Sequence, residues 1–256
     1  MTKKTDTPKT AESPLPLFYQ EPTPLDAKAH ADLSLKGDFT FKFAAETNAI
    51  PVNLIEFPQI CHFYPIAFSN DGSATPVAIL GLRNNENLFV SDKGEWNQDT
   101  YIPAYIRRYP FIFAENPEND QLTLCADLKS DMIEKSNKQP FFDKDGAPTQ
   151  LANNALEFCK SYHSAAQQTQ EFSKALAESG ILMDRQAEIT VADGNKITFS
   201  GFSVIDEQKL AALKDKDFLM WREKGWLPFL YAHLFSGTNW QRLTKLVTER
   251  SQAEAA

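Results

Sequence analysis

The most regular pattern of apolar positions lies in the second half of the chain. Mostly apolar side chains recur at steps of four and three residues, at positions 151, 155, 158, 162, 165, 169, 172 and 176. Because such steps return to one side of an α-helix, the pattern predicts a long helix with a single buried stripe. Thr149 is the predicted N-cap, and Gly180 is the predicted C-terminal stop. A coiled coil would use the same stripe, but its Ala, Tyr and Thr favour packing within one domain.

Shorter patterns in the first half are typical of strands. Phe39, Phe41 and Phe43 alternate with polar residues, which predicts a half-buried strand over 38–44. The runs 66–68 and 77–82 flank the turn-rich segment 69–75, which predicts two paired strands. The second run is apolar on both faces, so we expect it to be central.

The remaining elements of this half are short. We expect helix over 51–63, as one segment or two broken by Pro58, and over 101–109, where Pro110 ends it. Further strands are expected at 87–90, 111–113 and 122–125, with a loop over 115–120 between the last two.

The C-terminal part combines a hairpin with helices. Residues 189–191 and 197–199 are predicted to pair around an Asp193-Gly194 turn. Asp206 is a predicted N-cap, with Ile205 and Leu210 as a hydrophobic staple. Pro228 suits the first turn of a second helix, and Asn239 is expected to cap the last one.

These elements predict an α+β protein. A mainly antiparallel, β-rich N-terminal half over 15–126 is packed with the long helix, and a helix-rich part over 148–247 includes the β-hairpin. We expect a single domain over 15–247. The Pro-rich segment 1–14 is predicted to be a disordered tail, and the polar residues 248–256 are predicted to fray.

Composition narrows the environment and the partners. The 256 residues carry 26 Lys and Arg against 34 Asp and Glu, a net charge of −8, which disfavours nucleic-acid binding. Three Cys argue against a disulfide scaffold and fit a reducing compartment. Neither a signal-peptide core nor an apolar run long enough to span a membrane is present, so we predict a cytoplasmic protein without a membrane span. Export by an uncleaved C-terminal signal stays open.

Motifs of known chemistry are missing from the sequence. With only 10 Gly, it contains neither the dinucleotide-binding fingerprint nor the phosphate-binding loop. The three Cys lie far apart and the four His stand singly, so no pair has metal-ligand spacing, and no metal site and no cofactor are predicted. Cys61 and His62 are adjacent, but neighbours on a helix point about 100° apart and make a poor nucleophile and base. No catalytic residue is identified.

Two polar segments are the candidates for a ligand site. Arg83, Asn85 and Glu86 follow an apolar strand, while Tyr105 and Arg108 belong to a segment rich in Tyr and Arg. The structural interpretation is that Arg83 pairs with Glu86, and that one Arg of the second segment is solvated while the other holds a buried carboxylate. The functional interpretation is a polar ligand site of these five residues, which requires that they converge on one pocket.

Several blocks of the sequence resemble those of a known family. The segments 80–88 (LGLRNNENL) and 101–111 (YIPAYIRRYPF), together with short blocks at 56–58, 64–66, 201–202 and 232–234, are similar to the SapC family of bacterial proteins over residues 15–247. This family takes its name from a gene linked to a bacterial surface layer and its export. It has no established catalytic residues that could be transferred to this chain.

The resemblance favours one functional hypothesis over two others. It implies a non-enzymatic accessory or binding protein of envelope or surface-layer assembly or export, with a protein partner. The alternative is an enzyme, or a small-molecule- or peptide-binding partner of one, that uses the five polar residues. A third hypothesis is self-association through the 151–176 stripe; the oligomeric state stays open.

Overall fold

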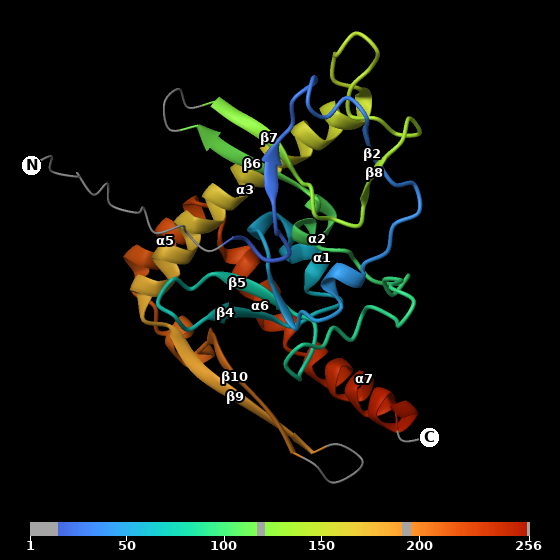
Figure 1. The fold of residues 1–256 in the computed structure, drawn as a ribbon. Helices are drawn as coiled ribbons and strands as arrows, with labels where there is room; N and C mark the ends of the chain where they lie inside the picture. Colours follow the sequence, from blue (N-terminus) through green and yellow to red (C-terminus); the bar gives the residue numbers. More distant parts are fainter. Residues whose placement is uncertain (1–14, 117–120, 191–195, 255–256) are drawn as a thin grey trace, which may run out of the picture.

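Antiparallel sheets joined by one long helix organise the chain (Figure 1). The computed structural model describes residues 15–116, 121–190 and 196–254. The structure is 38% helical and 22% strand, which confirms the predicted α+β class.

The larger sheet contains strands from both halves of the sequence. Its order is β3 (Ala49–Pro51), β5 (Pro76–Ile79), β4 (Ile66–Ser69), β10 (Lys196–Ile205) and β9 (Leu182–Thr190). The predicted pair of strands is therefore confirmed as β4 and β5, and β5 is internal. The C-terminal hairpin joins this sheet through only two residue pairs between β10 and β4. The predicted Asp193-Gly194 turn lies outside the described residues.

Two smaller sheets lie beside the first half of the long helix. One has the order β1 (Pro22–Pro24), β7 (Gln121–Asp127) and β6 (Phe111–Asn116), and the other pairs β2 (Leu33–Leu35) with β8 (Ile133–Lys135). The Asp127 carboxylate accepts hydrogen bonds from the backbone N–H groups of Gln20 and Glu21, at 3.0 and 2.8 Å. These bonds fix the N-terminal segment against the three-stranded sheet.

The long helix α3 (Gln150–Ser179) connects the two main clusters of buried apolar side chains. Thr149 caps it by accepting from the Ala152 N–H, and Gly180 ends it with a left-handed φ of 71°, as predicted. Its first half packs against Phe111 and Phe141, whereas Phe172 and Leu176 enter the larger cluster. The stripe thus packs within its own domain, as the sequence favoured, and it is buried at Thr169, Phe172 and Leu176 and partly buried at its other positions.

The remaining helices complete the fold, and one of them, α6, packs against the larger sheet. α6 contacts β4, β10 and α1. No helix within the described ranges is both long and apolar enough to cross the membrane. In chain order the other helices are η1 (Lys42–Ala44), η2 (Leu54–Glu56), α1 (Phe57–Ile60), α2 (Ala104–Arg108), α4 (Glu207–Ala211), α5 (Asp215–Glu223), α6 (Leu227–Ser236) and α7 (Asn239–Glu254).

The predicted strand over 38–44 is wrong. Its C-terminal part is the 3₁₀ turn η1. Phe41 packs edge-on against Trp96, and Phe43 lies 4.4 Å from Tyr109 between ring centroids. The alternation of Phe with polar residues therefore reflects rings inserted among loops. It does not reflect one face of a sheet.

Two further predictions are corrected by contacts distant in sequence. Residues 87–90 form no strand, since Val90 makes only an isolated bridge to Trp96. The Asn87 side chain instead donates a hydrogen bond to the Ala44 carbonyl and accepts one from the Phe89 N–H. The tail expected to fray from 248 is helical to Glu254. Its Arg250 donates hydrogen bonds to the carbonyls of Asn87 and Val90, each at 3.1 Å. The helix α5 was not predicted.

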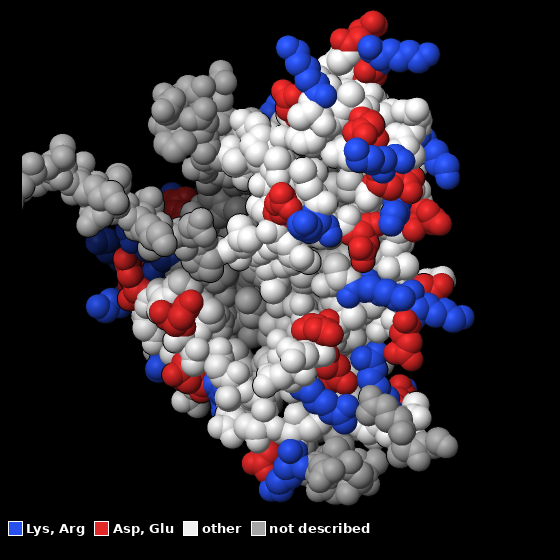
Figure 2. All heavy atoms as spheres, in the orientation of Figure 1, with Lys and Arg blue, Asp and Glu red and all other residues white. Residues whose placement is uncertain are grey.

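Charges of both signs are interspersed on the face of the molecule shown in Figure 2. Lys, Arg, Asp and Glu follow its margin, and its centre is largely uncharged. The net charge of −8 therefore does not concentrate into one acidic patch on this face.

The buried stripe of α3 makes a first prediction. Leu176 is 0% exposed, so Leu176→Ala should lower the free energy of unfolding by about 2–5 kcal/mol, through lost burial and the cavity left behind. Urea denaturation measures this loss. Leu219→Ala, at a position 43% exposed, is the matched control and should change stability by less than about 0.5 kcal/mol. Equal losses in the two variants would contradict this role of α3.

Candidate functional site

The first polar segment is tied to the C-terminal helix. Arg83 lies 3.4 Å from the Glu86 carboxylate, which confirms the expected pair, and it also donates to the Ser251 hydroxyl. Arg250 approaches the same carboxylate at 4.0 Å. Asn85 is exposed and holds a positive φ of 59°, so it serves the turn. These contacts are structural, since they bind the loop after β5 to α7.

The second polar segment faces α3. The Tyr105 hydroxyl donates to the Leu17 carbonyl at 3.3 Å. Arg107 is exposed and donates to the Ile102 carbonyl and the Tyr101 hydroxyl, as expected for a solvated Arg. Arg108 does not hold a buried carboxylate as the structural interpretation expected, because no Asp or Glu of the described residues lies within 4.0 Å of it. Its guanidinium instead lies over tyrosine rings.

The structure does not bring the five predicted site residues together. Arg83, Asn85 and Glu86 lie beside the end of α7, whereas Tyr105 and Arg108 lie between the N-terminal segment and α3. None of these five residues lines the cavity beside His233 or the groove between α4, α5 and α6. We therefore treat the two segments separately.

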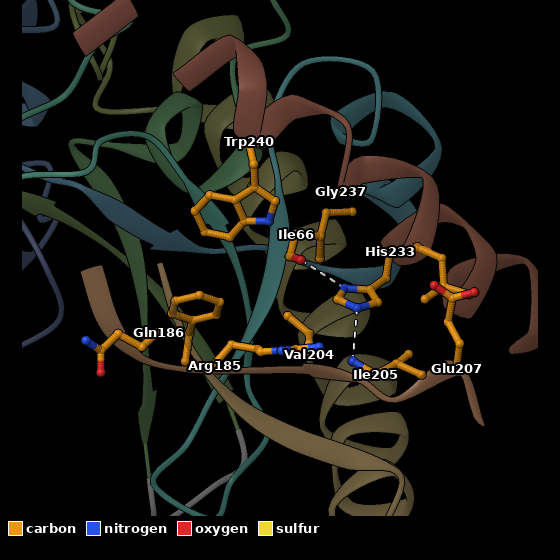
Figure 3. A pocket seen from close by; sticks show the side chains of 11 residues that line it. Ile66, Arg185, Gln186, Val204, Ile205, Glu207, His233, Gly237 and Trp240 are labelled. Carbon is orange, nitrogen blue, oxygen red and sulfur yellow. Dashed lines mark hydrogen bonds between the residues drawn. The ribbon is translucent and has the colours of Figure 1, made fainter. Parts of the chain in front are cut away.

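A cavity of about 330 Å³ lies between the hairpin and helices α6 and α7 (Figure 3). The apolar part of its lining includes Trp240, Phe202 and Ile66, and the polar part includes Arg185, Gln186 and Glu207. Trp240 packs against Phe202 with ring centroids 5.2 Å apart. An aromatic wall beside a guanidinium and a carboxylate suits the binding of a small polar group or a peptide side chain.

His233 lies at this cavity, and both of its ring nitrogens are already used (Figure 3). Nδ1 is 2.9 Å from the Ile66 carbonyl and donates to it, so Nε2 accepts from the Ile205 N–H at 3.1 Å. Burial lowers the pKa of His233 to about 4, so the ring is neutral at physiological pH. Because neither nitrogen is free, His233 acts as a structural bridge between β4 and β10 rather than as a general base.

The cysteines are protonated thiols at neutral pH. Burial raises the pKa of Cys159 to about 11, and it also raises the pKa values of Cys61 and Cys125. A nucleophilic cysteine needs a lowered pKa, so none of the three has the surroundings of an activated thiolate. Nor do the described residues contain a cluster of three His, Cys, Asp or Glu side chains able to hold a metal ion.

A groove of about 400 Å³ between α4, α5 and α6 presents apolar side chains to solvent. Phe218 and Tyr231 line it and are 37% and 47% exposed, and Phe235, one turn after Tyr231, is 68% exposed. Glu207 and Asp215 add acidic groups to the lining. We call Phe218, Tyr231 and Phe235 the α5–α6 patch. The sequence analysis missed this patch because a helical stripe alone does not show which positions another element covers.

Comparison with known proteins identifies the family. The SapC family model matches residues 25–243, so this chain belongs to the SapC family. No curated protein and no solved structure matches the chain. His233 lies in segment 232–234, one of the blocks that resemble the family. This resemblance was the one sequence signal that drew attention to His233.

The contacts of Arg250 make a second prediction. Arg250→Ala should lower the free energy of unfolding by about 1–3 kcal/mol, since two backbone carbonyls lose a charged donor. Thermal or urea unfolding measures the loss. Lys245→Ala removes an exposed ion pair on the same helix, and it should have little effect. No loss in the Arg250 variant would show that the end of α7 does not stabilise the fold.

The bridge made by His233 predicts a dependence of stability on pH. With a folded pKa of about 4 against 6.5, the neutral ring stabilises the fold fully above pH 6.5. This contribution, roughly 3 kcal/mol, is lost as the pH falls from 6.5 to 4. Nitrogen NMR of the imidazole should show the Nδ1–H form persisting at pH 5. Titration of His233 near 6.5 would contradict the bridge.

Proposed function

We propose that this protein is a non-catalytic accessory or binding protein of bacterial envelope or surface-layer assembly or export, acting from the cytoplasm through a protein partner. Membership of the SapC family supports the link to the envelope, through what the family name implies. The observation that carries the binding role is the α5–α6 patch, where Phe218 and Tyr231 of the groove and the neighbouring Phe235 are exposed.

The chemistry of the groove defines the partner segment. Large aromatic side chains exposed together are typical of protein-interaction sites, because their burial stabilises a complex. Glu207 and Asp215 in the groove lining favour a partner carrying Lys or Arg beside its apolar residues. We therefore expect an apolar segment with a basic residue, such as an amphipathic helix, to occupy the groove.

Substitution within the patch tests this proposal. Phe235→Ser should leave stability within about 0.5 kcal/mol of the wild type, because the side chain is 68% exposed, and it should abolish partner capture. Ile55→Ser is the matched control, since Ile55 is 72% exposed on η2. The measurement is affinity capture from native lysate followed by mass spectrometry.

Three results of these experiments bear on the proposal. The proposal is supported if envelope, surface-layer or export components are captured by the wild type and by the Ile55 variant, but lost with the Phe235 variant. It fails if the Phe235 variant captures the same proteins. A deletion strain with intact surface-protein export and normal envelope composition also counts against it.

A further inference from the structure

Arg108 is a cationic side chain that is surrounded by aromatic rings and has no anionic partner among the residues that the structure describes. Its guanidinium carbon lies 4.2 Å from the ring centroid of Tyr162, 4.9 Å from that of Tyr105 and 5.7 Å from that of Tyr19. Its Nε is buried and has no hydrogen-bond partner. The three rings come from the N-terminal segment, α2 and α3, so the fold assembles this surrounding from distant parts of the sequence.

The Tyr and Cys side chains near Arg108 supply no negative charge at neutral pH. Burial raises the pKa values of Tyr19, Tyr105 and Tyr162, and it raises that of Cys159 to about 11, so all four remain protonated. Cation–π contacts offset only part of the cost of removing a guanidinium from water.

Glu56 is the buried carboxylate of this region, and other donors occupy it. Its Oε1 accepts from the Ala104 N–H at 2.6 Å and from the Tyr101 hydroxyl at 3.1 Å. Its Oε2 accepts from the Asn53 N–H at 3.0 Å. Glu56 therefore fixes the start of α2 and does not neutralise Arg108.

We propose that Arg108 binds the oxyanion of a ligand, which is a carboxylate or a phosphate. Tyr19, Tyr105 and Tyr162 surround this site. A guanidinium matches both groups through paired N–H donors. The side chain is partly exposed, so a ligand can reach it. This site goes beyond the proposed partner-binding role and does not depend on the α5–α6 patch.

A neighbouring cavity indicates that the ligand is larger than a bare anion. Tyr162 also lines a cavity of about 540 Å³, together with Asn53, Thr169 and Ser173. The Ser173 hydroxyl is buried there without a hydrogen-bond partner. A ligand with its oxyanion at Arg108 can therefore extend past Tyr162 toward amide and hydroxyl groups.

Thermal unfolding in the presence of simple anions tests the site. Inorganic phosphate and acetate are titrated separately against sodium chloride at matched ionic strength, and a rise in Tm reports binding to the folded state. Arg108→Gln should weaken the apparent affinity by roughly tenfold or more, because charge-assisted hydrogen bonds are lost. Arg107→Gln is the matched control on the same helix and should respond like the wild type. A response to phosphate alone assigns a phosphate ligand, and a response to acetate assigns a carboxylate.

The proposal is overturned if neither anion raises Tm beyond chloride, or if Arg108→Gln responds as the wild type does. Phenylglyoxal labelling of the wild-type protein, mapped by mass spectrometry, covers the case in which that variant does not fold. Phosphate or acetate should protect Arg108 from labelling and leave Arg107 unchanged. Equal labelling of Arg108 with and without the anions would also overturn the site. Because partner capture is tested at Phe235, failure of one proposal leaves the other unaffected.

Discussion

The His233 bridge aligns the C-terminal hairpin with the strands of the first half of the chain, and the order of the larger sheet depends on this alignment. β10 and β4 share only two residue pairs, so their pairing attaches the hairpin to the rest of the sheet over a short length. His233 adds one hydrogen bond to each strand. Its Nδ1–H donates to the Ile66 carbonyl of β4, and its Nε2 accepts from the Ile205 N–H of β10. Ser236 continues the same connection, because its hydroxyl accepts from the Ile66 N–H and donates to the His233 carbonyl. One turn of α6 thus aligns two strands that are distant in sequence.

Helix α3 places the two candidate regions of the molecule in relation to each other. Its first half belongs to the cluster around Phe111 and Phe141, and its second half belongs to the larger cluster. Tyr162 lies between these halves and contacts Arg108. The cationic site therefore lies where the two clusters meet, while the α5–α6 patch belongs to the C-terminal helices. Such an arrangement allows a ligand and a protein partner to be bound at separate places.

Sequence patterns were reliable where one element determines its own structure. α3, with Thr149 and Gly180 at its ends, was predicted closely, because a buried stripe and its caps are local signals. The segment 38–44 failed, since alternating Phe residues can be buried among loops as well as in a sheet. The five candidate site residues are divided between two places for a related reason. Arg83 finds a carboxylate three residues later in the sequence, whereas Arg108 is surrounded by tyrosines that include Tyr19 and Tyr162 from distant segments.

By itself, the sequence determined the α+β class, the long helix, the hairpin strands and the family, because periodicity, capping residues and long blocks are properties of neighbouring residues. Only the tertiary structure decided that the two polar segments stay apart, that His233 is a bridge and that Arg108 has no counter-ion within the described part of the chain. Each of these depends on which side chains are brought close from distant segments, and no local pattern encodes that proximity. The exposure of the aromatic residues of α5 and α6 was also decided by the tertiary structure, since it depends on which surfaces the rest of the fold leaves uncovered.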